Sequence, residues 1–166
     1  AIAAVGSINR TMSPGNLVLP DQLIDYSWGR PSTYFENDLE QVVHIDFTHP
    51  YSVRLRADMI AATQRAKLTL VETGVYACMQ GPRLETAAEI KKLARDGCDL
   101  VGMTGMPEAS LAKELELDYA CCSVVVNWAA GLDGDSIDMQ DIEAFAESGM
   151  LKVEKLITAL ASKVTQ

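Results

Sequence analysis

The chain has 166 residues, of which 48% are hydrophobic and 22% are charged, and its formal net charge is −9. This length and composition fit one globular domain with a buried core, and no apolar run approaches the ~20 residues of a membrane helix. Lys and Arg form no cluster, so neither a nucleic-acid partner nor a membrane partner is expected. A single phosphate remains compatible with the acidic balance, because backbone N–H groups and hydroxyls at a helix start can bind it.

The front of the chain predicts a strand, a turn and a helix. Ala1–Ser7 is typical of a strand that leads into a turn, and Ser13–Asn16 carries a turn signal. Tyr51–Ala66 has apolar residues at helical spacing. The first residue is Ala rather than Met, and the opening lacks the basic and long apolar segments of a signal peptide. We therefore expect that sequence is missing upstream.

The rest of the chain alternates strands and helices. The predicted elements are a strand over Thr69–Met79, a helix over Glu85–Asp96, a strand over Asp99–Met103, a helix over Pro107–Leu115, a strand over Tyr119–Val126 and a final helix capped by Asp138. This alternation predicts an α/β domain with a mainly parallel or mixed central sheet flanked by helices. No linker interrupts it, so residues 1–166 are interpreted as part of one domain.

Polar residues stand where three of these strands end. In parallel sheets, ligands bind beyond the carboxyl ends of the strands, so Glu85, Thr104 and Asn127 would converge on one crevice if the strands are parallel neighbours. Thr104 can cap the next helix or bind an anion there. Glu85 fits the first turn of a helix without any function. Asn127 can shape a turn or pair with a ligand edge that offers both a donor and an acceptor.

Cysteines and histidines give weaker signals. His44 and His49 flank one carboxylate, Asp46, which is a weak zinc pattern, and no metal site is predicted. The four cysteines (Cys78, Cys98, Cys121 and Cys122) lack metal-ligand spacing and are interpreted as small buried thiols. Unpaired thiols predict a reducing, cytoplasmic compartment.

Two motifs identify a family. Gly81–Thr86 and Asp99–Glu108 resemble the Gly-Pro-x-Phe/Leu-Glu-Thr and Gly-Met-Ser/Thr-x-x-Pro-Glu motifs of the trimeric purine-nucleoside and methylthioadenosine phosphorylases, in the same order and separation. Ala3–Ser7 resembles the central phosphate-loop segment of that family. With Val126–Gly131, the chain is most similar to the bacterial S-methyl-5'-thioinosine phosphorylases. The resemblance covers essentially all of the chain. It implies that residues 1–166 are the C-terminal two-thirds of one nucleoside phosphorylase domain.

The resemblance also implies where phosphate and sugar bind. Thr104 and the backbone N–H near Ala4 would hydrogen-bond the phosphate, and Met103 would pack under the ribose. The family's N-terminal glycine-rich phosphate loop, its Arg-His pair and a further His-containing segment have no counterpart in this sequence. The alternative of a non-catalytic fragment, given below, rests on this difference.

The purine and the 5' substituent are assigned in the same way. Glu85 and Asn127 would face the purine, with Ala129 beside it, and Asn127 would be the catalytic residue that supports the leaving base. Ile137 and Met139 would form an apolar wall for a methylthio group. His44 would come from the neighbouring subunit of a homotrimer and close the pocket.

The implied reaction is phosphorolysis of a purine nucleoside, without a metal or organic cofactor and with inorganic phosphate as co-substrate. Adenosine-type members of the family carry Asp at the position of Asn127, whereas a neutral amide favours a 6-oxopurine. S-Methyl-5'-thioinosine is the expected substrate, cleaved in purine and methylthio salvage. Two alternatives remain open. One is a methylthioadenosine or a general inosine/guanosine phosphorylase, and the other is a non-catalytic fragment that keeps only an assembly surface.

Overall fold

A computed structural model describes residues 1–36, 43–134 and 137–162 of the chain. Its strands form one mixed sheet in the order β3-β5-β6-β1-β7-β2-β4. The strands are β1 (Ile2–Ser7), β2 (Leu17–Val18), β3 (Gln22–Asp25), β4 (Leu70–Val71), β5 (Val75–Cys78), β6 (Leu100–Gly102) and β7 (Cys122–Trp128). The predicted α/β class with a mixed sheet is confirmed.

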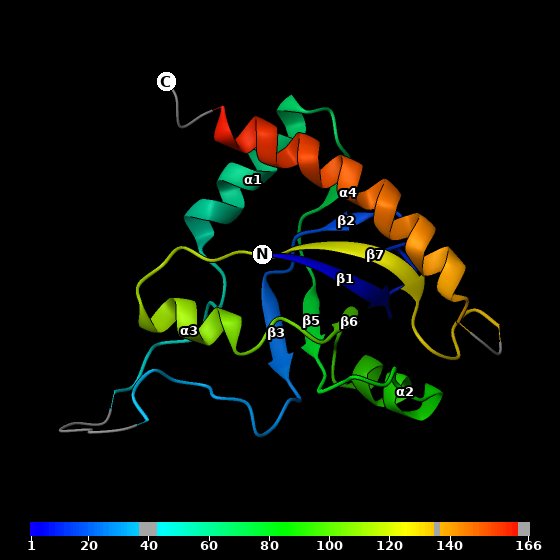
Figure 1. Cartoon of the computed structure of the whole chain (residues 1–166), viewed down its shortest axis with the longest axis horizontal. Helices are drawn as coiled ribbons and strands as arrows, with labels where there is room; N and C mark the ends of the chain where they lie inside the picture. Colours follow the sequence, from blue (N-terminus) through cyan, green and yellow to red (C-terminus); the bar gives the residue numbers. More distant parts are fainter. Residues whose placement is uncertain (37–42, 135–136, 163–166) are drawn as a thin grey trace.

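Helices pack on both sides of this sheet (Figure 1). They are α1 (Val53–Arg65), α2 (Ala87–Arg95), α3 (Glu108–Glu114) and α4 (Met139–Ala161). In Figure 1, α1 and α4 lie together at one side of the sheet, and α2 and α3 lie toward the other. No helix in the described part of the chain is both long enough and apolar enough to cross a membrane.

Local side-chain caps explain where three helices begin. The Ser52 hydroxyl accepts from the Leu55 N–H at the start of α1, and Asp138 caps α4, as predicted. Thr86 and Glu89 form a reciprocal capping box at the start of α2. Each cap satisfies a backbone N–H that has no partner within its helix.

The strand expected over Thr69–Met79 is wrong. The segment forms two short strands, β4 and β5, which lie near opposite ends of the sheet and are separated by a turn that includes Gly74. β4 pairs with β2, whereas β5 lies between β3 and β6. Glu72, Thr73 and Gly74 interrupt the two apolar runs and separate β4 from β5.

The first strand occupies the centre of the sheet. β1 runs parallel to β7 and antiparallel to β6, so β6 and β7 are antiparallel to each other and not adjacent. Ala3 and Val5 on β1 are buried, whereas Ala4 between them is exposed. The segment that resembles a phosphate loop is therefore a strand in this structure.

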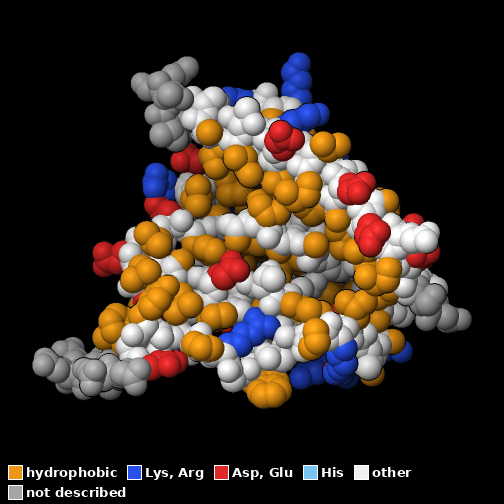
Figure 2. Space-filling view, viewed as in Figure 1, with side chains coloured by type: hydrophobic (Ala, Val, Ile, Leu, Met, Phe, Trp, Pro, Cys, Tyr) orange, Lys and Arg blue, Asp and Glu red, His pale blue; other side chains and the backbone are white. Residues whose placement is uncertain are grey.

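The core on the α4 side depends on a close approach of helix and sheet. A Cβ atom on Gly149 would lie 2.2 Å from Cγ1 of Val124, so only glycine lets α4 lie this close to β7. Val153 and Leu156 continue the buried face of α4. Figure 2 shows further hydrophobic side chains gathered along α4 and over the sheet on the face toward the viewer.

The cysteines are buried and unpaired, as expected. Burial raises the pKa of the Cys122 thiol to about 12, and burial also raises the pKa of the other three thiols. These groups therefore stay protonated near neutral pH and serve as small apolar side chains.

Candidate active site

The loops that follow β5 and β6 touch each other. Gly81 has a φ of +65°, and a Cβ atom placed on it would lie 2.5 Å from the Met103 sulfur. Glycine is therefore required at position 81 for both its backbone conformation and its lack of a side chain. This contact fixes Met103, the predicted ribose contact, against the loop after β5. We call residues 79–86 the first motif loop and residues 103–107, after β6, the second motif loop.

Thr104 contacts the hydroxyl of a buried tyrosine, Tyr76. Its backbone N–H donates to the Tyr76 hydroxyl at 3.3 Å, and its own hydroxyl lies 3.4 Å from the same oxygen. Tyr76 is fully buried, and burial raises the pKa of its hydroxyl, so it remains protonated and can donate to the Thr104 oxygen. The Thr104 hydroxyl hydrogen is then free to point toward an anion.

Thr104 is not the helix cap that was the alternative interpretation. α3 begins at Glu108, four residues beyond Thr104, and its N-cap is Pro107. Thr104 is exposed and lies in the connection between β6 and that helix. A hydroxyl in this position is available to a ligand.

Glu85 also lies outside a helix. Thr86 is the N-cap of α2, so Glu85 precedes the helix and the expected first-turn position is wrong. Its side chain is half-buried, and burial raises the pKa of the carboxyl, with Glu89 adding to the effect. A partly desolvated carboxylate gains from a hydrogen-bond donor, such as a ring N–H of a ligand.

Asn127 lies inside β7, one residue from its end, rather than after the strand. Its register partner in β1 is Gly6, and a Cβ atom on Gly6 would lie 3.5 Å from the Asn127 amide nitrogen. That amide donates to the Trp128 carbonyl at 2.7 Å. Asn127 and Ile137 both line a cavity of about 330 Å³ beside the start of α4.

The loop after β7 meets the first motif loop. A Cβ atom on Gly131 would lie 2.6 Å from the Cβ of Ala87 at the start of α2. A second cavity, of about 290 Å³, is lined by Leu84, Ala129 and Ile137 among others. The structure therefore brings Ala129 and Ile137 together with the motif loop that carries Glu85.

The expectation that Glu85, Thr104 and Asn127 follow three parallel neighbouring strands is wrong for one strand. β5 and β6 are parallel neighbours, as the strand-end argument requires. β7 is separated from β6 by β1 and runs antiparallel to it. Asn127 is therefore separated from the Thr104 loop by β1, the strand that carries the exposed Ala4. The cavity at Asn127 shares Ile137 with the cavity bordered by Leu84 of the first motif loop.

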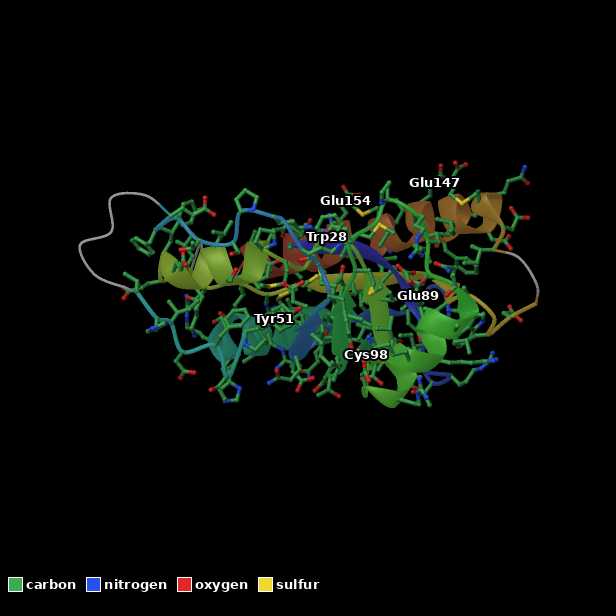
Figure 3. All side chains as sticks on the ribbon, turned by 90° about the horizontal axis from the view of Figure 1, so that it is seen from below. Trp28, Tyr51, Glu89, Cys98, Glu147 and Glu154 are labelled. Atoms are coloured by element: carbon green, nitrogen blue, oxygen red, sulfur yellow. The ribbon has the colours of Figure 1, made fainter. Side chains whose placement is uncertain are left out.

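Two further predicted residues are exposed in the single chain. Met139 is 59% exposed at the first position of α4. His44 is exposed, and the segment that follows it borders α3 in a cavity of about 560 Å³ lined by Ile45 and Tyr119 among others. Figure 3 places Tyr51, another residue of that cavity, well away from α2 and its Glu89.

No group of three or more His, Cys, Asp or Glu side chains is arranged to hold a metal ion in residues 1–36, 43–134 and 137–162. His44 and His49 therefore form no such centre with their neighbours within those ranges. The predicted independence from metals and organic cofactors stays a prediction.

Comparison with known proteins identifies the family. The model of the Phosphorylase superfamily matches residues 1–162. The chain belongs to this superfamily. It is 52% identical over 162 residues to a protein of Pseudomonas syringae pv. tomato named "Probable S-methyl-5'-thioinosine phosphorylase", and the match covers 98% of this chain and 66% of the relative. It is 40% identical over 164 residues to the 6-oxopurine nucleoside phosphorylase of Pyrococcus furiosus, covering 96% of this chain and 62% of the relative.

The fold agrees with this family. The chain superposes on methylthioadenosine phosphorylase from Schistosoma mansoni in complex with adenine with a TM-score of 0.93 and 23% identity, covering 99% of this chain and 65% of that one. The chain spans 62–66% of the lengths of these three proteins.

Two residues of the site were missed by sequence reasoning. Tyr76 lies in the middle of an apolar strand, and only the fold brings its hydroxyl to Thr104. Arg30 lies in a segment rich in Gly, Pro and Ser that predicts only a loop, yet its guanidinium contacts both motif loops. Neither residue carries a local signal for these contacts.

Proposed function

We propose that the full-length protein is a purine nucleoside phosphorylase that cleaves S-methyl-5'-thioinosine with phosphate. The products would be hypoxanthine and 5-methylthioribose 1-phosphate. The observation that carries this proposal is the neutral amide of Asn127 at a cavity that shares Ile137 with the cavity bordered by Leu84 of the first motif loop. Membership of the superfamily and the names of the relatives support the same reaction.

The phosphate end of the site would be built by Thr104 and β1. The Thr104 hydroxyl, oriented by Tyr76, would donate to one phosphate oxygen, and the backbone N–H near Ala4 would donate to another. As the C1'–N9 bond breaks, positive charge develops on the sugar, and the bound phosphate dianion stabilises it before forming the new C1'–O bond. Positioning and charge stabilisation would thus perform the reaction without a metal or organic cofactor.

Asn127 would support the leaving base. Its amide nitrogen can donate to the 6-oxo oxygen as the C1'–N9 bond breaks, and its amide oxygen can accept from N7–H once a proton from water has been added to N7 of the departing base. The current hydrogen bond to the Trp128 carbonyl would have to be exchanged for these contacts. Glu85 would accept from a ring N–H on another edge, with Ala129 beside the base. The bond from the Asn127 amide nitrogen to the 6-oxo oxygen strengthens as negative charge builds on the ring, so Asn127 would be the catalytic residue.

The 5' methylthio group calls for an apolar wall and a second subunit. Ile137, which lines both cavities, would supply part of this wall, and Met139 would join it. His44 is exposed in its own chain, and we propose that it closes the pocket of a neighbouring copy in a homotrimer. The expected setting is purine and methylthio salvage in the cytoplasm.

A general 6-oxopurine nucleoside phosphorylase is the second candidate. The 40% identity to the protein from Pyrococcus furiosus, which is named for that activity, favours it. Asn127 would act in the same way in both, and the two differ in how the 5' position is recognised.

The decisive assay is phosphate-dependent release of base. Full-length protein is incubated with methylthioinosine with and without phosphate, and hypoxanthine and the sugar phosphate are quantified. We expect equal amounts of both products and no release without phosphate. Release of hypoxanthine without a sugar phosphate would indicate a hydrolase and contradict the proposal, and no release from any purine nucleoside would favour the non-catalytic alternative.

A further inference from the structure

Arg30 joins the two motif loops through their backbone. Its Nη1 donates to the carbonyl oxygens of Met103, at 2.9 Å, and of Met106. Its Nη2 donates to the carbonyl oxygens of Met79, at 3.1 Å, and of Gln80, at 3.0 Å. One partly buried guanidinium thus bonds two carbonyls on each loop, in the forked arrangement that only arginine offers.

These bonds begin where the sheet ladder ends. The last bond between the neighbouring strands runs from the Met79 N–H to the Gly102 carbonyl, at 2.7 Å. Beyond it the chains diverge, one toward Glu85 and the other toward Thr104. The carbonyls that would otherwise need water or a strand partner turn toward Arg30 instead.

The segment that carries Arg30 is itself attached to the same place. The backbone N–H of Trp28 donates to the side-chain oxygen of Gln80 at 3.1 Å, and Figure 3 marks Trp28 on this segment. No carboxylate in the described part of the chain lies within ion-pair distance of Arg30. Its positive charge is therefore shared among carbonyl dipoles close to the loop of Thr104.

We propose that Arg30 is a positioning residue that fixes the two motif loops relative to each other. It would hold Glu85 and Thr104 at the spacing needed to bind purine and phosphate in one complex. The expected loss of activity rests on the proposed function, whereas the expected effect on the two loops does not.

Arg56 offers a matched control. Its guanidinium also donates to several backbone carbonyls, those of Leu19 and Pro20, at 3.2 Å each, and that of Glu72. These contacts tie α1 to the β2–β4 end of the sheet, away from the motif loops. Arg30→Lys and Arg56→Lys therefore each remove a guanidinium group that bonds several backbone carbonyls, the first at the motif loops and the second between α1 and the sheet.

The test measures hydrogen exchange and kinetics in the full-length protein. In Arg30→Lys we expect faster exchange of the amides of residues 79–86 and of residues 103–107 together. We also expect kcat/KM for methylthioinosine to fall by at least about tenfold, because each bond from a charged donor contributes about that factor. Arg56→Lys should leave those amides unchanged and kcat/KM within about threefold, the scale of a change that removes no contact of the site.

Chemical rescue separates positioning from general stability. Millimolar guanidinium should raise the activity of Arg30→Ala by at least about fivefold, because the free ion can donate to the carbonyls that Arg30 bonds in wild type. NaCl at the same concentration should not raise it. Arg56→Ala should show no such rescue.

Four outcomes would overturn the proposal: exchange that rises in one loop only, exchange that rises in neither, a kinetic loss no larger than that of Arg56→Lys, or failure of both Arg30 variants to fold while the Arg56 variants fold. If wild-type protein cleaves no purine nucleoside, the proposed function fails, and the exchange of the two loops alone decides on Arg30.

Discussion

Tyr76→Phe tests how Thr104 is oriented. The change removes one hydroxyl, the group that accepts from the Thr104 N–H at 3.3 Å and lies 3.4 Å from the Thr104 hydroxyl. The ring itself should stay in place, because it is fully buried and packed where Gly102 and Gly105 have no Cβ. A Cβ atom on those glycines would lie 2.2 Å and 2.9 Å from Tyr76 atoms.

The expected loss follows from these two contacts. Both are long for hydrogen bonds, so together they should contribute ~1 kcal/mol, which corresponds to a ~5-fold fall in kcat/KM for phosphate. Thr104→Ala removes the proposed phosphate donor itself and should cost ~10-fold or more in phosphate KM or kcat. Because Tyr76 would act through Thr104, the double variant should lose little more than Thr104→Ala alone.

The assay is steady-state phosphorolysis of methylthioinosine at varied phosphate, with wild type, both single variants and the double variant. Urea unfolding of each protein controls for lost stability. A double variant that loses the full product of the two single effects, ~50-fold, would refute the reasoning, because the two residues would then act independently. Unchanged phosphate kinetics in Thr104→Ala would remove Thr104 from the phosphate site.

Three further predictions concern stability and assembly. The hydrogen bonds from Arg83 and the Thr86 N–H lower the pKa of Glu89 to about 2 from its ordinary 4.5, so its stabilisation is present above pH 4.5 and is lost as the pH falls through about 2. Wild type should therefore be more stable than Glu89→Gln at pH 6 in urea unfolding, and the difference should shrink toward pH 2.5; a difference that does not depend on pH would contradict this. The Tyr51 hydroxyl is buried without a hydrogen-bond partner among the described residues, so Tyr51→Phe should leave the free energy of unfolding unchanged or raise it by ~1 kcal/mol, whereas a loss larger than that would reveal a partner. If His44 completes a neighbour's pocket, light scattering should give a trimer at micromolar concentration, and a fully active monomer would refute this role.

The helices could be predicted from local sequence because their determinants are local. Asp138 caps α4 as expected, and the apolar face of that helix, with Val153 and Leu156, packs on the sheet. The predicted start at Glu85 was two residues too early, since the Thr86–Glu89 capping box places the first helical residue at Ala87.

The sheet could be predicted only in class, because its order depends on contacts between distant segments. The insertion of β1 between β6 and β7 joins residues about a hundred positions apart, and no local pattern encodes it. The same limit applies to the site. Asn127 could be found by its motif, but the contacts that Tyr76 and Arg30 make with the motif loops exist only once the fold has formed.

The most direct test of the central claim is a comparison of kcat/KM for methylthioinosine, methylthioadenosine and inosine in wild type and in Asn127→Asp. Wild type should cleave methylthioinosine much faster than methylthioadenosine. Asn127→Asp should shift the preference toward the 6-amino purine, because a carboxylate accepts from that amino group but faces a 6-oxo oxygen without a donor, a mismatch that costs ~1–3 kcal/mol in a buried site. The methylthio preference should survive the substitution, since it depends on the wall at Ile137 and Met139. Equal rates on the two methylthio substrates in wild type would contradict the assignment of Asn127 as the residue that selects the base.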